Sequence, residues 1–165
     1  MLRFAEAVPN GDVLDLACGS GRHTRLFLAR GHRVVAVDRD TSGLADLAGH
    51  DALETLALDL EDGRPFPLGD RRFAAVVVAN YLHRPLLPDL LRAVAPGGLL
   101  IYETFARGNE LLGPPRSPEF LLAPGELLDA VAGGLRVVAY EDLTVAEPRP
   151  AAVQRICAAA PAERR

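Results

Sequence analysis

Short apolar runs alternate with helix-like patterns along most of this chain, and that alternation restricts the fold to one class. Seven runs read as strands, at 13–17, 33–38, 55–58, 73–79, 99–105, 136–143 and 153–160. Parallel neighbours need crossover connections, and right-handed crossovers place helices on both faces of a sheet. The last two runs have no helical pattern between them, so we expect them to pair antiparallel. The pattern predicts an α/β, doubly wound, mostly parallel seven-stranded sheet with an antiparallel edge strand.

The length of 165 residues predicts a single domain over residues 1–165. No apolar run approaches the roughly 18 residues that a membrane span requires, so we expect no membrane association. Acidic residues outnumber basic ones by 22 to 18, a balance that weighs against a nucleic-acid partner. Every basic residue is arginine, and the absence of lysine excludes both a Schiff-base lysine and a P-loop lysine.

The two cysteines, Cys18 and Cys157, are isolated and show no spacing typical of a metal site. We therefore expect no metal. Isolated cysteines also favour a cytoplasmic location, where thiols stay reduced.

A glycine-rich turn joins the first strand to the first helix. Gly19-Ser20-Gly21 follows the strand, and the helical pattern begins at Arg22. A turn without Cβ atoms at a helix N-terminus permits close approach by a ligand. Asp38 ends the second strand 17 residues after Gly21, which is where a carboxylate can accept hydrogen bonds from both hydroxyls of a ribose. The combination predicts nucleoside binding.

Asp59, at the end of the third strand, is placed to accept a hydrogen bond from an adenine amino group. A dinucleotide fingerprint requires a third glycine, and Thr24 occupies that position. A dehydrogenase-like protein that binds a nicotinamide dinucleotide is therefore a weaker alternative than a protein that binds a single nucleoside.

The segment Asp15–Gly21 resembles the first motif, D-x-G/A-C-G-x-G, of the class I S-adenosylmethionine-dependent methyltransferases. Asp38 matches the acidic residue that follows the second strand in that family. Leu58-Asp59-Leu60 resembles the segment beside the adenine, and Ala95-Pro96-Gly97-Gly98 resembles the turn before the fifth strand. The pattern in Phe120–Leu128 is similar to that of the tellurite-resistance and thiopurine group, which methylates small molecules.

This resemblance implies a Rossmann-like fold, S-adenosyl-L-methionine as cofactor, and roles for particular residues. Asp15 would orient the loop or the methionine amino group, and Ala17, Gly19 and Gly21 would lie against the methionine part of the cofactor. Asp38 would bind the ribose diol.

The resemblance also implies the residues around the base and the methyl group. Asp59 would bind the adenine amine, with Arg39 and Leu60 flanking the ring, and Asn80 would lie beside the reactive methyl. Tyr81 is a candidate catalytic residue, as a wall or a hydrogen-bond donor.

His83 is the second candidate catalytic residue, as a general base, although it can equally brace its loop. The segment 106–124 is long, and loops of this length in compact domains are often functional. It carries Arg107, Asn109, Arg116 and Phe120, and we expect it to form the substrate wall for an anionic or aromatic acceptor.

The sequence therefore predicts a cytoplasmic methyltransferase that acts on a small-molecule acceptor, and it leaves a homodimer open. Two alternatives stay open. One is an RNA or protein methyltransferase, against which the acidic balance and the few aromatic residues weigh. The other is a module that binds S-adenosylmethionine without catalysis.

Overall fold

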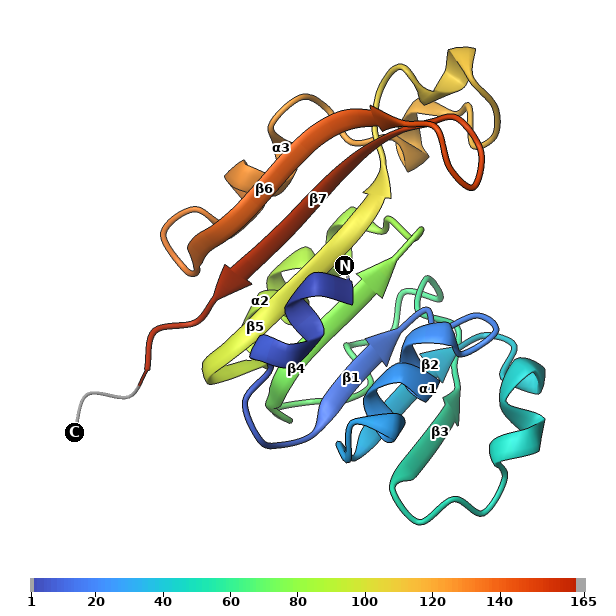
Figure 1. Ribbon diagram of the computed structural model, residues 1–165, viewed down its shortest axis with the longest axis vertical. Helices are drawn as coiled ribbons and strands as arrows, with labels where there is room; N and C mark the ends of the chain where they lie inside the picture. The colour runs from blue at the N-terminus through green and yellow to red at the C-terminus, as the bar shows by residue number, and fades with distance from the viewer. Residues whose placement is uncertain (1, 163–165) are drawn as a thin grey trace.

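The structure, a computed structural model that describes residues 2–162, contains one seven-stranded sheet with helices on both faces (Figure 1). In sheet order the strands are β3 (Leu53–Ala57), β2 (Val34–Asp38), β1 (Val13–Leu16), β4 (Phe73–Ala79), β5 (Val94–Phe105), β7 (Ala151–Ala159) and β6 (Arg136–Val145). Every pair from β3 to β5 is parallel, and β7 is antiparallel to both of its neighbours. The predicted fold is confirmed, with β7 lying between β5 and the edge strand β6.

Three α-helices and five short 3-10 helices surround the sheet. They are α1 (Arg22–Ala29), α2 (Leu87–Ala93), α3 (Glu126–Val131), η1 (Leu2–Ala7), η2 (Ser42–Leu47), η3 (Arg84–Leu86), η4 (Asn109–Leu111) and η5 (Pro118–Phe120). None of the helices within residues 2–162 has the length and apolar character needed to cross a membrane.

The buried residues of the central strands alternate between two apolar clusters, as the period of two in a strand requires. Val76 and Val78 of β4 pack in the cluster that contains residues of α2 and α3. Ala75 and Val77 pack in the other cluster, with Phe27 of α1. Both faces of β4 are therefore covered, which explains why its sequence is continuously apolar.

The order of the strands fixes where a ligand can enter. Strand β1 pairs with β2 on one side and with β4 on the other. The chain therefore continues from β1 to β2 in one half of the sheet and from β4 to β5 in the other half. In open α/β sheets a crevice forms at the carboxyl ends of the strands at this switch point. The glycine turn and Asp38 both lie there.

Two predicted elements differ clearly from the observed ones, and the ends of the other strands differ from their predictions by at most two residues. The fifth strand begins at Val94, earlier than predicted, because β5 bulges: Phe73 pairs with Val94, whereas Ala75 already pairs with Leu99. The helix predicted after Thr41 is the 3-10 helix η2, which packs so closely on the glycine turn that a Cβ on Gly43 would lie 2.9 Å from the Cα of Ser20. The segment 60–72 contains no helix, as predicted.

Candidate functional site

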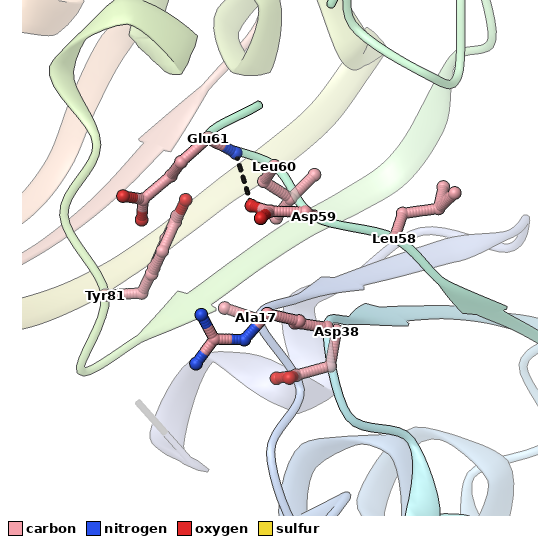
Figure 2. Close-up of a pocket in the computed structure, with 8 residues that line it drawn as sticks. Ala17, Asp38, Leu58, Asp59, Leu60, Glu61 and Tyr81 are labelled. Atoms are coloured by element: carbon pink, nitrogen blue, oxygen red, sulfur yellow. Dashed lines mark hydrogen bonds between the residues drawn. The ribbon is translucent and has the colours of Figure 1, made fainter. Parts of the chain in front are cut away.

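A cavity of about 280 Å³ opens at the carboxyl ends of β1, β2 and β3 (Figure 2). Its lining contains three carboxylates, those of Asp38, Asp59 and Glu61, together with one guanidinium and apolar and aromatic side chains. The complete lining is Ala17, Asp38, Arg39, Leu58, Asp59, Leu60, Glu61 and Tyr81. Five of the predicted cofactor-binding residues therefore come together here with Tyr81.

Asp38 joins the end of β2 to the glycine turn. Its Oδ2 accepts a hydrogen bond from the backbone N–H of Gly19 at 2.8 Å, and its Oδ1 accepts one from the N–H of Asp40 at 3.0 Å. These two bonds fix the carboxylate at the rim of the cavity. An ionised carboxylate has about four acceptor positions, so positions remain for ligand hydroxyls.

The two glycines of the turn have different roles. Gly21 has φ of 78°, and a Cβ there would lie 2.1 Å from Leu44 Cδ2 and 2.8 Å from Arg25 Nη1. Packing of η2 and α1 therefore requires glycine at position 21. A Cβ on Gly19 would meet no heavy atom within 4 Å, so the turn is open to a ligand at that point.

Asp15 lies behind the turn and outside the cavity lining. Its side chain is buried at 2% exposure, and its Oδ2 accepts a hydrogen bond from Thr24 Oγ1 at 2.7 Å. Burial raises the pKa of this carboxyl to about 6, although the bond from Thr24 acts in the opposite direction. Asp15 thus ties β1 to the first turn of α1.

Backbone strain is concentrated at the same edge of the sheet. Ala17, after β1, has φ of 54°, and Asn80, after β4, has φ of 55°. Among the described residues these are the two non-glycine positions with positive φ. Left-handed backbone at side-chain-bearing residues is costly and tends to gather at functional sites.

A second cavity, of about 330 Å³, adjoins the first and shares Glu61 and Tyr81 with it. Its lining is Glu61, Asn80, Tyr81, Leu82, Thr104, Phe105, Pro115 and Phe120. Asn80 therefore lines the second cavity, whereas Asp38 lines the first. Burial, and next the negative charge of Glu61, raise the pKa of the Tyr81 hydroxyl, so this group stays protonated and serves as a donor.

His83 lines neither cavity. Its Nδ1 lies 4.0 Å from Glu61 Oε2, and its backbone carbonyl accepts a hydrogen bond from Leu86. The sequence analysis missed Glu61 as a site residue. Its position directly after Leu58-Asp59-Leu60 was the available signal, because that segment borders the adenine position in the resemblance.

The loop 106–124 contributes to the second cavity, but differently from the prediction. Phe120 lines the cavity, whereas Arg107 and Arg116 are exposed and line neither cavity. Asn109 is buried: its Nδ2 donates to the carbonyls of Gly113 and Pro115, and its Oδ1 accepts from the N–H of Ala152. Asn109 therefore holds the loop on β7 and does not face a substrate.

A cluster of three or more histidine, cysteine, aspartate or glutamate side chains suited to a metal ion does not occur in residues 2–162. The polar groups that line the two cavities are carboxylates, the Arg39 guanidinium, a protonated phenol, an amide and a hydroxyl.

Comparisons with known proteins agree with this geometry. Malonyl-[acyl-carrier protein] O-methyltransferase of Serratia marcescens is 32% identical over 114 residues, which are 66% of this chain and 44% of that protein. The chain spans less than half the length of the curated relatives it matches most strongly.

Two solved structures show the same fold. One is 1,6-didemethyltoxoflavin-N1-methyltransferase of Burkholderia thailandensis, solved with its namesake compound and S-adenosylhomocysteine. It has a TM-score of 0.71 and 21% identity, covering 96% of this chain and 74% of that one. The other is TehB of Haemophilus influenzae, with a TM-score of 0.76 and 16% identity, covering 96% and 60%.

A family model described as a methyltransferase domain matches residues 13–98, just over half of the chain. The matched segment runs from β1 to the turn inside β5 and contains the glycine turn, Asp38, Asp59 and Tyr81. The chain therefore belongs to the methyltransferase domain family, with the class I S-adenosylmethionine-dependent architecture that its sequence resembles.

Proposed function

We propose that this chain binds S-adenosyl-L-methionine and transfers its methyl group to a small-molecule acceptor. The observation that carries the proposal is the pair of adjoining cavities, which share Glu61 and Tyr81. One cavity has the carboxylates expected around a nucleoside, and the other has a different, more apolar lining. A donor and an acceptor in the two cavities would meet beside Tyr81.

The residues of the first cavity fit the cofactor. Asp38 would accept hydrogen bonds from the ribose hydroxyls with the acceptor positions that Gly19 and Asp40 leave free. Asp59 would bind the adenine amine, because only its Oδ1 is engaged, by the N–H of Glu61 at 2.9 Å. Arg39 and Leu60 would flank the ring.

The sulfonium group of the bound cofactor supplies a methyl group that is already activated for in-line displacement. The protein therefore contributes mainly position and exclusion of water. Tyr81 forms the wall between the cavities, and its hydroxyl keeps its proton and can donate a hydrogen bond, since its pKa is raised. We assign His83 to support of Glu61, because it lies beside that carboxylate and outside both linings.

A cytoplasmic location and a homodimer belong to the same proposal. The thiols of Cys18 and Cys157 are both buried and unpaired, which is typical of a reducing compartment.

The edge strand β6 exposes Val137 and Val138, and an uncovered strand edge favours pairing with a second copy.

Thermal unfolding with S-adenosylhomocysteine and with NAD tests the cofactor. A ligand at 100 times its dissociation constant adds ~2.7 kcal/mol to the free energy of unfolding, a shift of roughly 5–10 °C for a domain of this size. We expect that shift with S-adenosylhomocysteine and none with NAD.

The matched variants are Asp38→Ala and, as control, Asp51→Ala at an exposed turn. Asp38→Ala should lose most of the shift and Asp51→Ala should keep it. An equal response of the two variants, or a shift with NAD alone, contradicts the proposal.

A further inference from the structure

The second cavity has a lining that selects among acceptors. Resting on the proposed function, we propose that the acceptor is a flat nitrogen-bearing ring, neutral or protonated, which donates an N–H hydrogen bond to Glu61. The same lining disfavours a carboxylate or phosphate acceptor. The lining of the second cavity supports this proposal by its shape, its charge and its unpaired hydrogen-bonding groups.

The walls of the cavity favour an aromatic ring. Phe105 and Phe120 lie in the lining with Leu82 and Pro115. Phe120 is 43% exposed, an unusual degree for phenylalanine, at the edge of this cavity. A volume of about 330 Å³ holds on the order of ten water molecules at ~30 Å³ each, which suits one or two fused rings.

The charge of the lining is negative. Glu61 is its one carboxylate, and the other polar members, Asn80, Tyr81 and Thr104, carry an amide and two hydroxyls. Tyr81 adds no positive charge, and its raised pKa keeps it from adding a negative one. An anionic ligand would therefore bring its charge against Glu61 with no cation in the lining to balance it, an arrangement that disfavours binding.

The cations on the loop side of the second cavity have other partners, and Arg39 lines the first cavity but not the second. The Arg149 guanidinium lies 5.7 Å from the centroid of Phe105 and donates to the Pro114 carbonyl at 3.0 Å. Arg84 forms an ion pair with Glu126 and also donates to backbone carbonyls of the loop. Neither lines the cavity, so neither compensates an anion there.

Glu61 itself lacks a hydrogen-bond donor. Among residues 2–162 no side chain or backbone N–H donates to its carboxylate, and His83 Nδ1 at 4.0 Å is beyond hydrogen-bond distance. Beside it, the Tyr81 hydroxyl oxygen is closed to solvent and also has no partner within those residues. Figure 2 shows the Tyr81 ring pointing toward the Glu61 side chain. The Glu61 side chain is 47% exposed, so its carboxylate is open to the cavity and can accept a charge-assisted hydrogen bond from a ligand N–H.

Three ring-matched probes test this inference on protein saturated with S-adenosylhomocysteine. Benzimidazole carries an N–H, benzofuran has the same shape without one, and benzimidazole-5-carboxylate adds a negative charge. Dissociation constants come from chemical-shift titration by NMR. We expect benzimidazole to bind at least tenfold more tightly than either of the other probes, since a hydrogen bond to a charged group has that effect.

Two variants and one control identify the residues responsible. Glu61→Gln should bring the three dissociation constants within about threefold of one another, whereas Glu6→Gln, an exposed residue of η1, should leave the preference intact. Phe120→Ala should weaken all three probes by a similar factor. Because Phe120 does not line the first cavity, this variant should keep its affinity for S-adenosylhomocysteine.

The inference is overturned if the carboxylate probe binds as tightly as benzimidazole, if no probe binds, or if the preference survives in Glu61→Gln. Affinity for S-adenosylhomocysteine is measured separately for each protein, because Glu61 lines both cavities. If the unaltered protein does not bind S-adenosylhomocysteine, the proposed function itself is wrong. Failure of the proposed function can therefore be told apart from failure of this inference.

Discussion

Ala17 has a left-handed backbone at the end of β1, a conformation that raises the free energy of the folded state for any residue with a Cβ. Replacement by glycine relieves ~1–2 kcal/mol of strain and costs about 0.5–1 kcal/mol of backbone entropy. We therefore expect Ala17→Gly to stabilise the protein by roughly 0.5 kcal/mol in urea unfolding.

Ala29→Gly is the matched control, because Ala29 is the exposed last residue of helix α1, where glycine adds about 0.5 kcal/mol of backbone entropy cost and relieves no strain. The two substitutions should change stability in opposite directions. If Ala17→Gly destabilises the protein as much as Ala29→Gly does, the strain at position 17 is not real.

Asp15 makes stability depend on pH in a predictable direction. Its pKa is about 6 in the fold against 3.8 for the free group, so the folded protein binds an extra proton between about pH 4 and pH 6. The contribution of Asp15 to stability is therefore greatest below pH 4 and falls as the pH rises to 6. Above pH 6 the buried charge costs about 3 kcal/mol, at 1.36 kcal/mol for each unit of pKa.

Asp15→Asn removes that charge while its amide oxygen can still accept the bond from Thr24. We expect the variant to be more stable than the unaltered protein by about 1–3 kcal/mol at pH 7.5 and equally stable near pH 4. Urea unfolding at the two pH values measures this. A stability difference that does not change between them would show that the charge of Asp15 is not the cause.

Among structural elements, the loop 106–124 is held over the second cavity by Arg84. This residue follows β4 and donates from Nη1 to the Glu119 carbonyl at 2.7 Å and from Nη2 to the Leu121 carbonyl at 2.9 Å. Its Nε also pairs with Glu126 at 2.6 Å. One side chain therefore connects the end of β4, the loop and the start of α3.

Arg84→Met should release the loop without affecting the first cavity, which Arg84 does not line. We expect amide exchange at residues 119–122 to become at least tenfold faster, since their protection depends on local opening. Affinity for S-adenosylhomocysteine should stay within threefold. Arg116→Met, at an exposed position of the same loop, is the control, and equal exchange in the two variants would contradict the role given to Arg84.

The sequence predicted the bounds of an element well where those bounds depend on neighbouring residues alone. The strand Phe73–Ala79 matches its prediction at both ends because both faces are buried and the run is uninterrupted. The start of β5 was missed because a bulge lets the strand continue through Pro96-Gly97-Gly98, residues that ordinarily end an element. Only the pairing with β4 reveals this.

At the scale of the whole molecule, the topology decides which distant residues meet. The proximity of Gly19 and Asp38 could be predicted from the sequence, because a strand–turn–helix–strand unit brings the two residues together at the same edge of the sheet. The second cavity could not be predicted, since Glu61, Thr104 and Phe120 come from three separate segments: the connection after β3, strand β5 and the loop 106–124. Asn109 was misjudged for the same reason: its partner Ala152 lies on β7, far along the chain.

The family match ends at residue 98, so it covers the first cavity and leaves much of the second outside. Thr104, Phe105, Pro115 and Phe120 all follow that limit. This division separates cofactor binding, which the matched segment would provide, from acceptor choice, which the later residues would provide.

A crystal structure of the protein with S-adenosylhomocysteine tests the central claim most directly. The account predicts both ribose hydroxyls within hydrogen-bond distance of the Asp38 carboxylate and the amino-acid end of the ligand against Gly19. It also predicts that the sulfur faces Tyr81 and the second cavity. A ribose bound away from Asp38, or a ligand whose sulfur points away from Tyr81, would contradict it.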